Sequence, residues 1–128
     1  MEEKEIIKTY FEALEQGDYE KLMELFDDKA IAKSPLYGKI SVKKFYKKLL
    51  EDTGNSKIDL LHIFVNKEKN SGAGHFKYTW TLKDNSHSSF GGVDVFNFNN
   101  KGKIQQITII YDTYGTRESF NKMKEEMI

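Results

Sequence analysis

The feature of this sequence that most constrains its fold is a change in the spacing of apolar residues near the middle of the chain. Before residue 53, apolar residues recur every three or four positions, which is typical of amphipathic helices. From Ile58 onward they alternate with polar residues, which is typical of strands half-buried in a sheet. Helices followed by a run of strands predict an α+β fold, in which helices cover one face of a mixed, mainly antiparallel sheet.

Three helices are predicted in the first half of the chain. The first ends at Gly17, a residue type that commonly terminates helices, and Asp18 and Ser41 can cap the second and third. The apolar faces consist of Ile6, Ile7, Tyr10, Phe11 and Leu14 in the first helix, Tyr19, Leu22, Met23, Leu25 and Phe26 in the second, and Val42, Phe45, Tyr46, Leu49 and Leu50 in the third. Each helix therefore has one side to bury against a sheet.

Four long strands are predicted in the second half, separated by turns rich in Gly, Asn, Asp and Ser. They span residues 58–65, 75–83, 90–98 and 103–113; a short strand is expected at 30–34 and a short helix within 115–128, through Phe120, Met123 and Met127. Long strands twist and curve. A curved sheet closed by three helices makes a cone with an aromatic-lined interior, a natural place for a small-molecule pocket. Residues 1–128 have the length of a single domain.

Composition excludes several classes of function. Twenty Lys and Arg residues balance twenty Asp and Glu residues, so neither nucleic acid nor an anionic membrane is favoured as a partner. Without cysteine there is no thiol nucleophile or thiolate metal site, and the three histidines lack metal-ligand spacing, so no metal is expected. No glycine loop suited to phosphate is present, and no cofactor is expected. The charged N-terminus and the lack of a long apolar run predict a cytoplasmic domain.

The strand over residues 90–98 carries a carboxyl group on an aromatic face. Alternation places Asp94 on the same side as Phe90, Phe96 and Phe98. Burying a carboxylate there is costly unless it is paired, hydrogen-bonded or protonated. Either this face is partly wet, or Asp94 only ties down a neighbouring backbone, or Asp94 is a functional carboxyl in a pocket.

Four segments together resemble the nuclear transport factor 2-like superfamily, which includes ketosteroid isomerases and SnoaL-like polyketide cyclases. They are residues 10–18 (YFEALEQGD), 25–30 (LFDDKA), 34–38 (SPLYG) and 93–96 (VDVF). The resemblance covers nearly the whole chain and implies a cone-shaped fold. Because this fold carries enzymes, binding proteins and association domains alike, it implies a function only loosely.

The resemblance to the isomerases implies roles for two residues. Tyr10 falls where that family has its oxyanion-hole tyrosine, and Asp94 falls where it has a protonated aspartic acid that donates to the same oxygen. Two fixed donors in a dry site stabilise the negative charge that develops on an enolate oxygen. Tyr10 can equally be a core residue whose hydroxyl finds a nearby partner.

The chain differs from the isomerases at the position of the residue that acts as their base. Ser34 stands before Pro35 where those enzymes place a proton-shuttling aspartate, and a serine is too weak a base to replace it unless another group activates it. Asp112 resembles the acid/base aspartate of the SnoaL-like cyclases, although it can instead be a polar residue at a strand end with Arg117 as its partner. Gly92 occupies the place of an arginine in limonene epoxide hydrolase-like members, which argues against that chemistry.

Further residues are candidates for contact with a ligand. Ser34, Tyr78, Trp80 and Phe96 can line the cavity, and for the aromatic residues simple packing gives the same pattern. His62 can act as a base, but a lone histidine on an apolar face is more often a core residue with a satisfied hydrogen bond.

Three hypotheses for function follow. The first is an isomerase or cyclase in which Asp94 and Tyr10 polarise a carbonyl and Asp112 or His62 moves the proton. The second is a non-catalytic protein that binds a small, largely apolar ligand with a carbonyl or hydroxyl group. The third is an association module. A homodimer through the outer face of the sheet is also expected from the resemblance, and the residues assigned to that face are Thr79, Thr81, Ile107, Ile109 and Tyr111.

Overall fold

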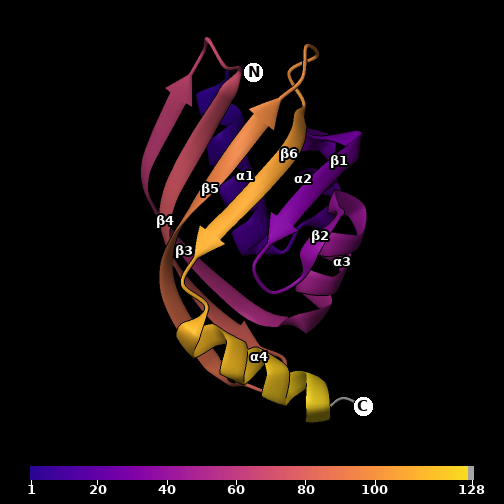
Figure 1. Cartoon of the computed structure of the whole chain (residues 1–128), viewed down its shortest axis with the longest axis vertical. Helices are drawn as coiled ribbons and strands as arrows, with labels where there is room; N and C mark the ends of the chain where they lie inside the picture. Colours follow the sequence, from indigo (N-terminus) through magenta and orange to yellow (C-terminus); the bar gives the residue numbers. More distant parts are fainter. Residues whose placement is uncertain (127–128) are drawn as a thin grey trace.

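The computed structural model describes residues 1–126 of the 128-residue chain. Its helices are α1 (Glu3–Gln16), α2 (Tyr19–Leu25), α3 (Val42–Asp52) and α4 (Tyr114–Glu126), and its strands are β1 (Phe26–Ser34), β2 (Gly38–Ser41), β3 (Thr53–Asn66), β4 (Ser71–Leu82), β5 (His87–Phe98) and β6 (Ile104–Tyr111). The strands form one curved, unclosed sheet with α1, α2 and α3 on one side, and α4 lies across one end (Figure 1). The predicted α+β fold is confirmed.

The three N-terminal helices form where the sequence predicts them. Gly17 ends α1 with a φ of 68°, the Asp18 side chain accepts a hydrogen bond from the Lys21 N–H, and the Ser41 side chain accepts one from the Lys44 N–H. The second helix is one residue shorter than predicted, because Phe26 already begins β1. Among the described residues, none of the helices is long and apolar enough to cross a bilayer.

The sheet has the order β2-β1-β6-β5-β4-β3, and only the β1–β6 pair is parallel. Several strands begin earlier than predicted, and one strand was not predicted. Gly38–Ser41 forms the short strand β2, which pairs with β1, and β3 begins at Thr53 directly after α3 instead of following a loop. Helix α4 confirms the helix predicted at the C-terminal end, while Met127 lies outside the described residues.

The prediction that Ile107, Ile109 and Tyr111 lie on the outer face of the sheet is wrong. Ile109 pairs with Asp94 and Ile107 with Phe96, and residues directly opposite one another in a sheet share a face. All three therefore face the helices, and Ile107 is fully buried. Thr79 and Thr81 do lie on the outer face, where the homodimer stays a prediction.

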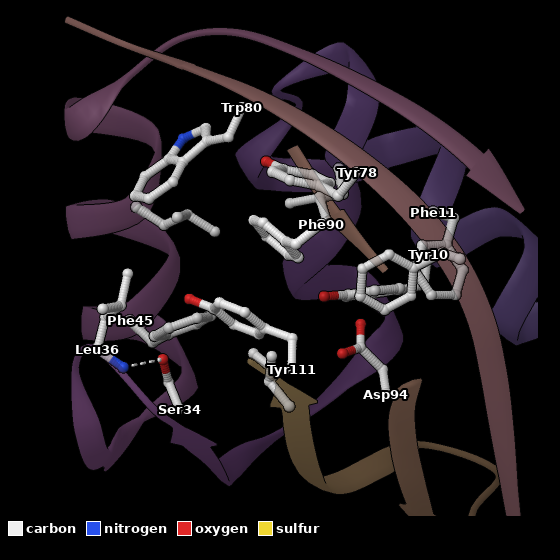
Figure 2. A pocket seen from close by; sticks show the side chains of 14 residues that line it. Tyr10, Phe11, Ser34, Leu36, Phe45, Tyr78, Trp80, Phe90, Asp94 and Tyr111 are labelled. Carbon is white, nitrogen blue, oxygen red and sulfur yellow. Dashed lines mark hydrogen bonds between the residues drawn. The ribbon is translucent and has the colours of Figure 1, made fainter. Parts of the chain in front are cut away.

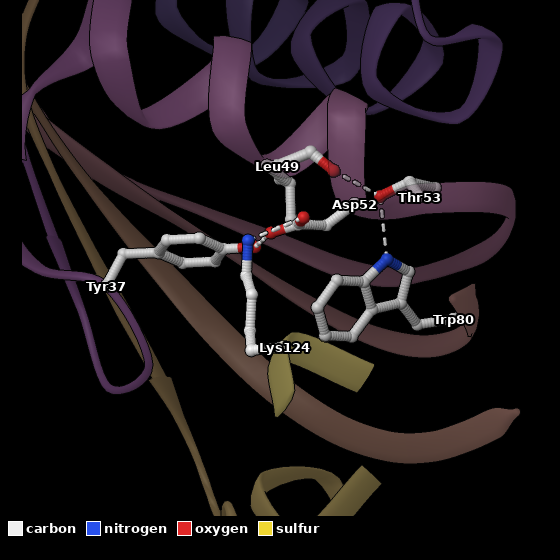
Figure 3. A network of polar contacts seen from close by, with 6 residues as sticks. All are labelled: Tyr37, Leu49, Asp52, Thr53, Trp80 and Lys124. Carbon is white, nitrogen blue, oxygen red and sulfur yellow. Dashed lines mark hydrogen bonds and ion pairs between the residues drawn. The ribbon is translucent and has the colours of Figure 1, made fainter. Parts of the chain in front are cut away.

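A polar network joins α4 to the rest of the molecule (Figure 3). The buried Asp52 carboxyl accepts hydrogen bonds from the Tyr37 hydroxyl at 2.6 Å and from the Lys124 ammonium at 2.7 Å. Burial, and then the hydrogen bond to Asp52, raises the pKa of Tyr37 far above its usual value, so its hydroxyl is the donor. The Phe120 ring stacks on Trp80, with ring centroids 6.2 Å apart. Helix α4 is thereby fixed over the end of the sheet.

Candidate functional site

A pocket lies between the concave face of the sheet and helices α1 and α3 (Figure 2). Its cavity volume is about 50 Å³, enough for a few water-sized groups. The wall is almost entirely apolar and is formed by Tyr10, Phe11, Leu14, Ser34, Leu36, Phe45, Leu49, Phe76, Tyr78, Trp80, Phe90, Asp94, Ile109 and Tyr111. The pocket therefore suits a small or slender molecule with little polar surface.

Asp94 is the carboxyl group of this pocket. It projects from the middle of β5 and is only 3% exposed. Within the described part of the chain, nothing donates a hydrogen bond to its Oδ1 atom. Burial raises the pKa of Asp94 far above its usual range, and no cation among the described residues opposes this. Burial therefore favours the neutral carboxylic acid over the carboxylate and leaves one polar atom of this pocket residue without a hydrogen bond.

Tyr10 reaches the pocket from α1 and belongs to a pair of buried phenols. Its hydroxyl lies 2.6 Å from the hydroxyl of Tyr46 on α3. Burial, followed by the nearby Tyr46 and Asp94, raises the pKa of Tyr10 well above its usual value, so the phenol stays protonated. The Tyr10 hydroxyl and the Asp94 carboxyl point toward the same part of the cavity (Figure 2). When Tyr46 donates to Tyr10, the Tyr10 proton is free to point at a ligand oxygen.

Ser34 lines the pocket but has a structural role as well. Its Oγ accepts hydrogen bonds from the backbone N–H groups of Leu36 and Tyr37, both at 3.3 Å, and so stabilises the turn after β1. No histidine or second carboxyl is among the described residues that line the cavity. The structure therefore gives Ser34 no partner that could turn it into a base.

The aromatic wall contains one predicted and one unexpected tyrosine. Burial raises the pKa of Tyr78 to about 12, and its hydroxyl lies 2.8 Å from the Ser56 Oγ. Tyr111, assigned from sequence to the outer face, stacks on Phe90 with ring centroids 4.1 Å apart. Trp80 also lines the pocket, as predicted. Phe96 is fully buried behind Tyr10, with ring centroids 5.1 Å apart, and is not part of the wall.

Two other predicted residues lie away from the pocket. A register shift after Leu60 turns His62 to the outer face, where its Nδ1 lies 3.2 Å from the Nδ1 of His75. Asp112 is exposed, and its Oδ1 accepts a hydrogen bond from the Tyr114 N–H at the start of α4. Neither can move a proton at Asp94. Within residues 1–126, no three His, Asp or Glu side chains are gathered closely enough to hold a metal ion.

Replacing Asp112 by alanine tests its structural role. The variant should lower the free energy of unfolding by about 1 kcal/mol, because the first N–H group of α4 loses its acceptor. Binding of a small ketone in the pocket should not change. Chemical denaturation and calorimetric titration with acetophenone measure the two effects, with Asp112→Asn as a control that keeps an acceptor. A loss of ketone binding without a loss of stability would restore Asp112 to the site.

Comparison with known proteins gives one family and a set of structural neighbours. The model of the SnoaL-like domain matches residues 7–107. No curated protein matches the chain. Among solved structures, an NTF2-like protein of unknown function from Exiguobacterium sp. 255-15 is similar with a TM-score of 0.72, at 16% identity over 84% of this chain and 98% of that one.

Two further structures have the same fold. SalBIII, described as an epoxide hydrolase/cyclase-like enzyme in pyran ring formation in the polyether salinomycin, is similar with a TM-score of 0.72, at 20% identity over 85% of this chain and 89% of its own. AclR from Streptomyces galilaeus is similar with a TM-score of 0.73, at 13% identity over 93% of this chain and 80% of its own. At these identities the likeness shows the fold and leaves the chemistry to the residues of the pocket.

Proposed function

The chain belongs to the SnoaL-like domain family, and from this premise we propose that it binds a carbonyl compound whose carbonyl end is small, uncharged and largely apolar, in the pocket around Asp94. The observation that carries the proposal is the Asp94 Oδ1 atom, which is buried without a partner among the described residues. A buried polar atom without a hydrogen bond costs free energy, and a bound carbonyl oxygen that accepts the carboxylic proton removes this cost.

The pair Asp94 and Tyr10 would polarise the carbonyl. Both groups are buried, and burial favours the protonated form of each, so each would donate a hydrogen bond to one oxygen without bringing a charge into the apolar cavity. Fixed donors in a dry site favour the state in which negative charge has moved onto that oxygen. Carbonyl compounds that carry an anionic group next to the carbonyl would be disfavoured by the apolar wall.

The reaction that best suits a pocket with one carboxyl is an intramolecular addition. A hydroxyl oxygen of the substrate forms a bond to the carbonyl carbon, and the π electrons move to the carbonyl oxygen, which takes the proton of Asp94. The hydroxyl proton then returns to the Asp94 carboxylate, so the enzyme ends as it began. This cyclisation needs no second base, whereas an isomerisation would need one where Ser34 stands. The part that SalBIII takes in pyran ring formation agrees with this class of reaction.

A non-catalytic ligand-binding protein is the second candidate. Its support is the absence of a basic side chain among the described residues of the pocket, together with the small cavity. Opening of an epoxide is not favoured, because Gly92 leaves no room for the arginine expected of that chemistry: a Cβ there would lie 2.9 Å from the Ile110 carbonyl oxygen.

Acetophenone labelled with ¹³C at its carbonyl provides the test. The bound carbonyl resonance should move downfield in the wild-type protein, because hydrogen bonding withdraws electrons from the carbon, and this shift should become clearly smaller in Asp94→Leu, where only Tyr10 remains as a donor. The methyl protons should not exchange with deuterium faster than in buffer, since the pocket offers no base. Unshifted bound ketone would contradict the proposal, and accelerated exchange would point to an isomerase instead.

A further inference from the structure

A second pocket lies behind one wall of the pocket around Asp94. It forms where the C-terminal end of α1 faces the beginning of β3, and its volume is about 270 Å³. Leu14 lines both pockets. The two cavities are therefore direct neighbours.

The wall between the two pockets consists of aromatic rings held by hydroxyl groups of β3. The Tyr78 ring lines the first pocket, and its hydroxyl is hydrogen-bonded to Ser56, which lines the second. The Trp80 ring lines the first pocket, and its Nε1 donates to the Thr53 Oγ1 at 2.7 Å, while Thr53 lines the second (Figure 3). Where Tyr78 meets Ser56 and where Trp80 meets Thr53, a single hydrogen bond therefore joins the two sides of the wall between the pockets.

The second pocket is polar, and its electrostatic character is negative. Glu15 carries the only charge among the described residues that line it. One Glu15 oxygen accepts a hydrogen bond from the Ile58 N–H at 2.7 Å, and the exposed side chain leaves the other oxygen accessible. The last turn of α1 has no basic residue to offset the partial negative charge of a helix C-terminus. A cation is therefore favoured here over an anion.

We propose that the second pocket receives the cationic tail of the ligand whose carbonyl lies at Asp94, and that the tail passes through the wall where Tyr78 meets Ser56. The inference rests on the proposed function and narrows its substrate class to elongated carbonyl compounds that bear an amine at the far end. An ammonium group would lie beside the Glu15 carboxylate, and the Ser56 hydroxyl released from Tyr78 would hydrogen-bond to the tail.

Four probes that share one ketone test the inference. They are acetophenone itself and acetophenone with a para aminopropyl, hydroxypropyl or carboxyethyl chain, titrated by calorimetry into the 128-residue chain. The aminopropyl probe should bind about tenfold more tightly than the carboxyethyl probe, because a partly exposed charge pair and a helix terminus each contribute modestly. The hydroxypropyl probe should fall between them.

Two variants separate the tail from the carbonyl end. Glu15→Gln keeps an acceptor for the Ile58 N–H and removes the charge, so the preference for the aminopropyl probe should fall to about threefold or less. Glu12→Gln, on the exposed side of the same helix, is the matched control and should keep the full preference. Ser56→Ala should speed association of the aminopropyl probe and leave that of acetophenone unchanged.

The outcomes distinguish this inference from the proposed function. If acetophenone binds and the tails make no difference, or if the carboxyethyl probe binds most tightly, the second pocket does not hold a cationic tail although the carbonyl site stands. If none of the four ketones binds, the proposed function itself fails. An aminopropyl preference that survives Glu15→Gln would place the amine elsewhere, and an unchanged association rate in Ser56→Ala would exclude the route through the wall.

Discussion

Replacing Asp94 by leucine should raise the free energy of unfolding at pH 7 by about 1–3 kcal/mol and weaken the polarisation of a bound ketone to the part that Tyr10 supplies. The gain in stability is expected because the folded protein holds a buried carboxyl with an unpaired oxygen, and an apolar side chain of similar shape removes that cost. Denaturation in urea measures the stability. The ¹³C shift of bound acetophenone measures the loss of function.

The same group should make stability depend on pH in a defined direction. Burial raises the pKa of Asp94 in the folded protein above the value of about 3.9 in the unfolded chain. Between these two values the folded state holds a proton that the unfolded state has released, so the contribution of Asp94 to stability falls as pH rises from about 4 and levels off above the folded pKa. The difference in unfolding free energy between wild type and Asp94→Asn should therefore widen in favour of the variant over that window.

Asp94→Asn separates the charge from the hydrogen bond. Its amide cannot ionise, so the pH-dependent difference should appear, yet its N–H can still donate to a carbonyl oxygen and ketone binding should be retained in part. The difference in unfolding free energy between wild type and Asp94→Asn could instead stay constant from pH 4 to pH 8. That result would mean that Asp94 is an ordinary, solvated carboxylate in the folded protein. The proposed carbonyl site would then lose its basis.

The position of Asp94 could be predicted because alternation within one strand depends on local sequence alone. Phe90, Asp94 and Phe96 share a face whatever the neighbouring strands do, and the structure buries that face. Which face of β6 lies on the same side of the sheet as Asp94 depends instead on the pairing register between β5 and β6. A shift at Asn97 and Phe98 changes the pairing by one residue, and a slip of one residue exchanges the two faces of a strand. That shift, which the turn residues did not reveal, brings Tyr111 into the pocket.

The same limit explains the other residues of the site. The shift after Leu60 moves His62 outward, and Asp112 points away because it lies one residue beyond Tyr111. Tyr46 could be predicted to lie on the apolar face of α3, but its hydrogen bond to Tyr10 depends on how two helices far apart in sequence pack together. Contacts within an element were therefore accessible from sequence, whereas contacts that depend on register or helix packing were not.

Replacing Gly92 by alanine should have the second large effect, a loss of about 1–3 kcal/mol in the free energy of unfolding. A Cβ at this position would lie 2.9 Å from the Ile110 carbonyl oxygen and 2.9 Å from the Phe76 Cζ atom. The Ile110 oxygen is part of the neighbouring strand and cannot rotate away, so β5 and β6 would have to separate. Phe76 would have to move into the cavity that it lines, and acetophenone should bind more weakly as well.

Gly91→Ala is the matched control, because the adjacent residue lies on the opposite face of the same strand. Its Cβ would come no closer than 3.8 Å to the Phe76 carbonyl oxygen, an ordinary contact, so the variant should be as stable as the wild type within about 0.5 kcal/mol. Urea denaturation and calorimetric titration with acetophenone, applied to both variants, compare the two positions. An equal change in the free energy of unfolding at residues 91 and 92 would show that the close contacts of a Cβ at residue 92 do not decide the outcome. A loss confined to Gly92→Ala would show that the absent side chain keeps β5 against β6 and leaves Phe76 at the wall of the pocket.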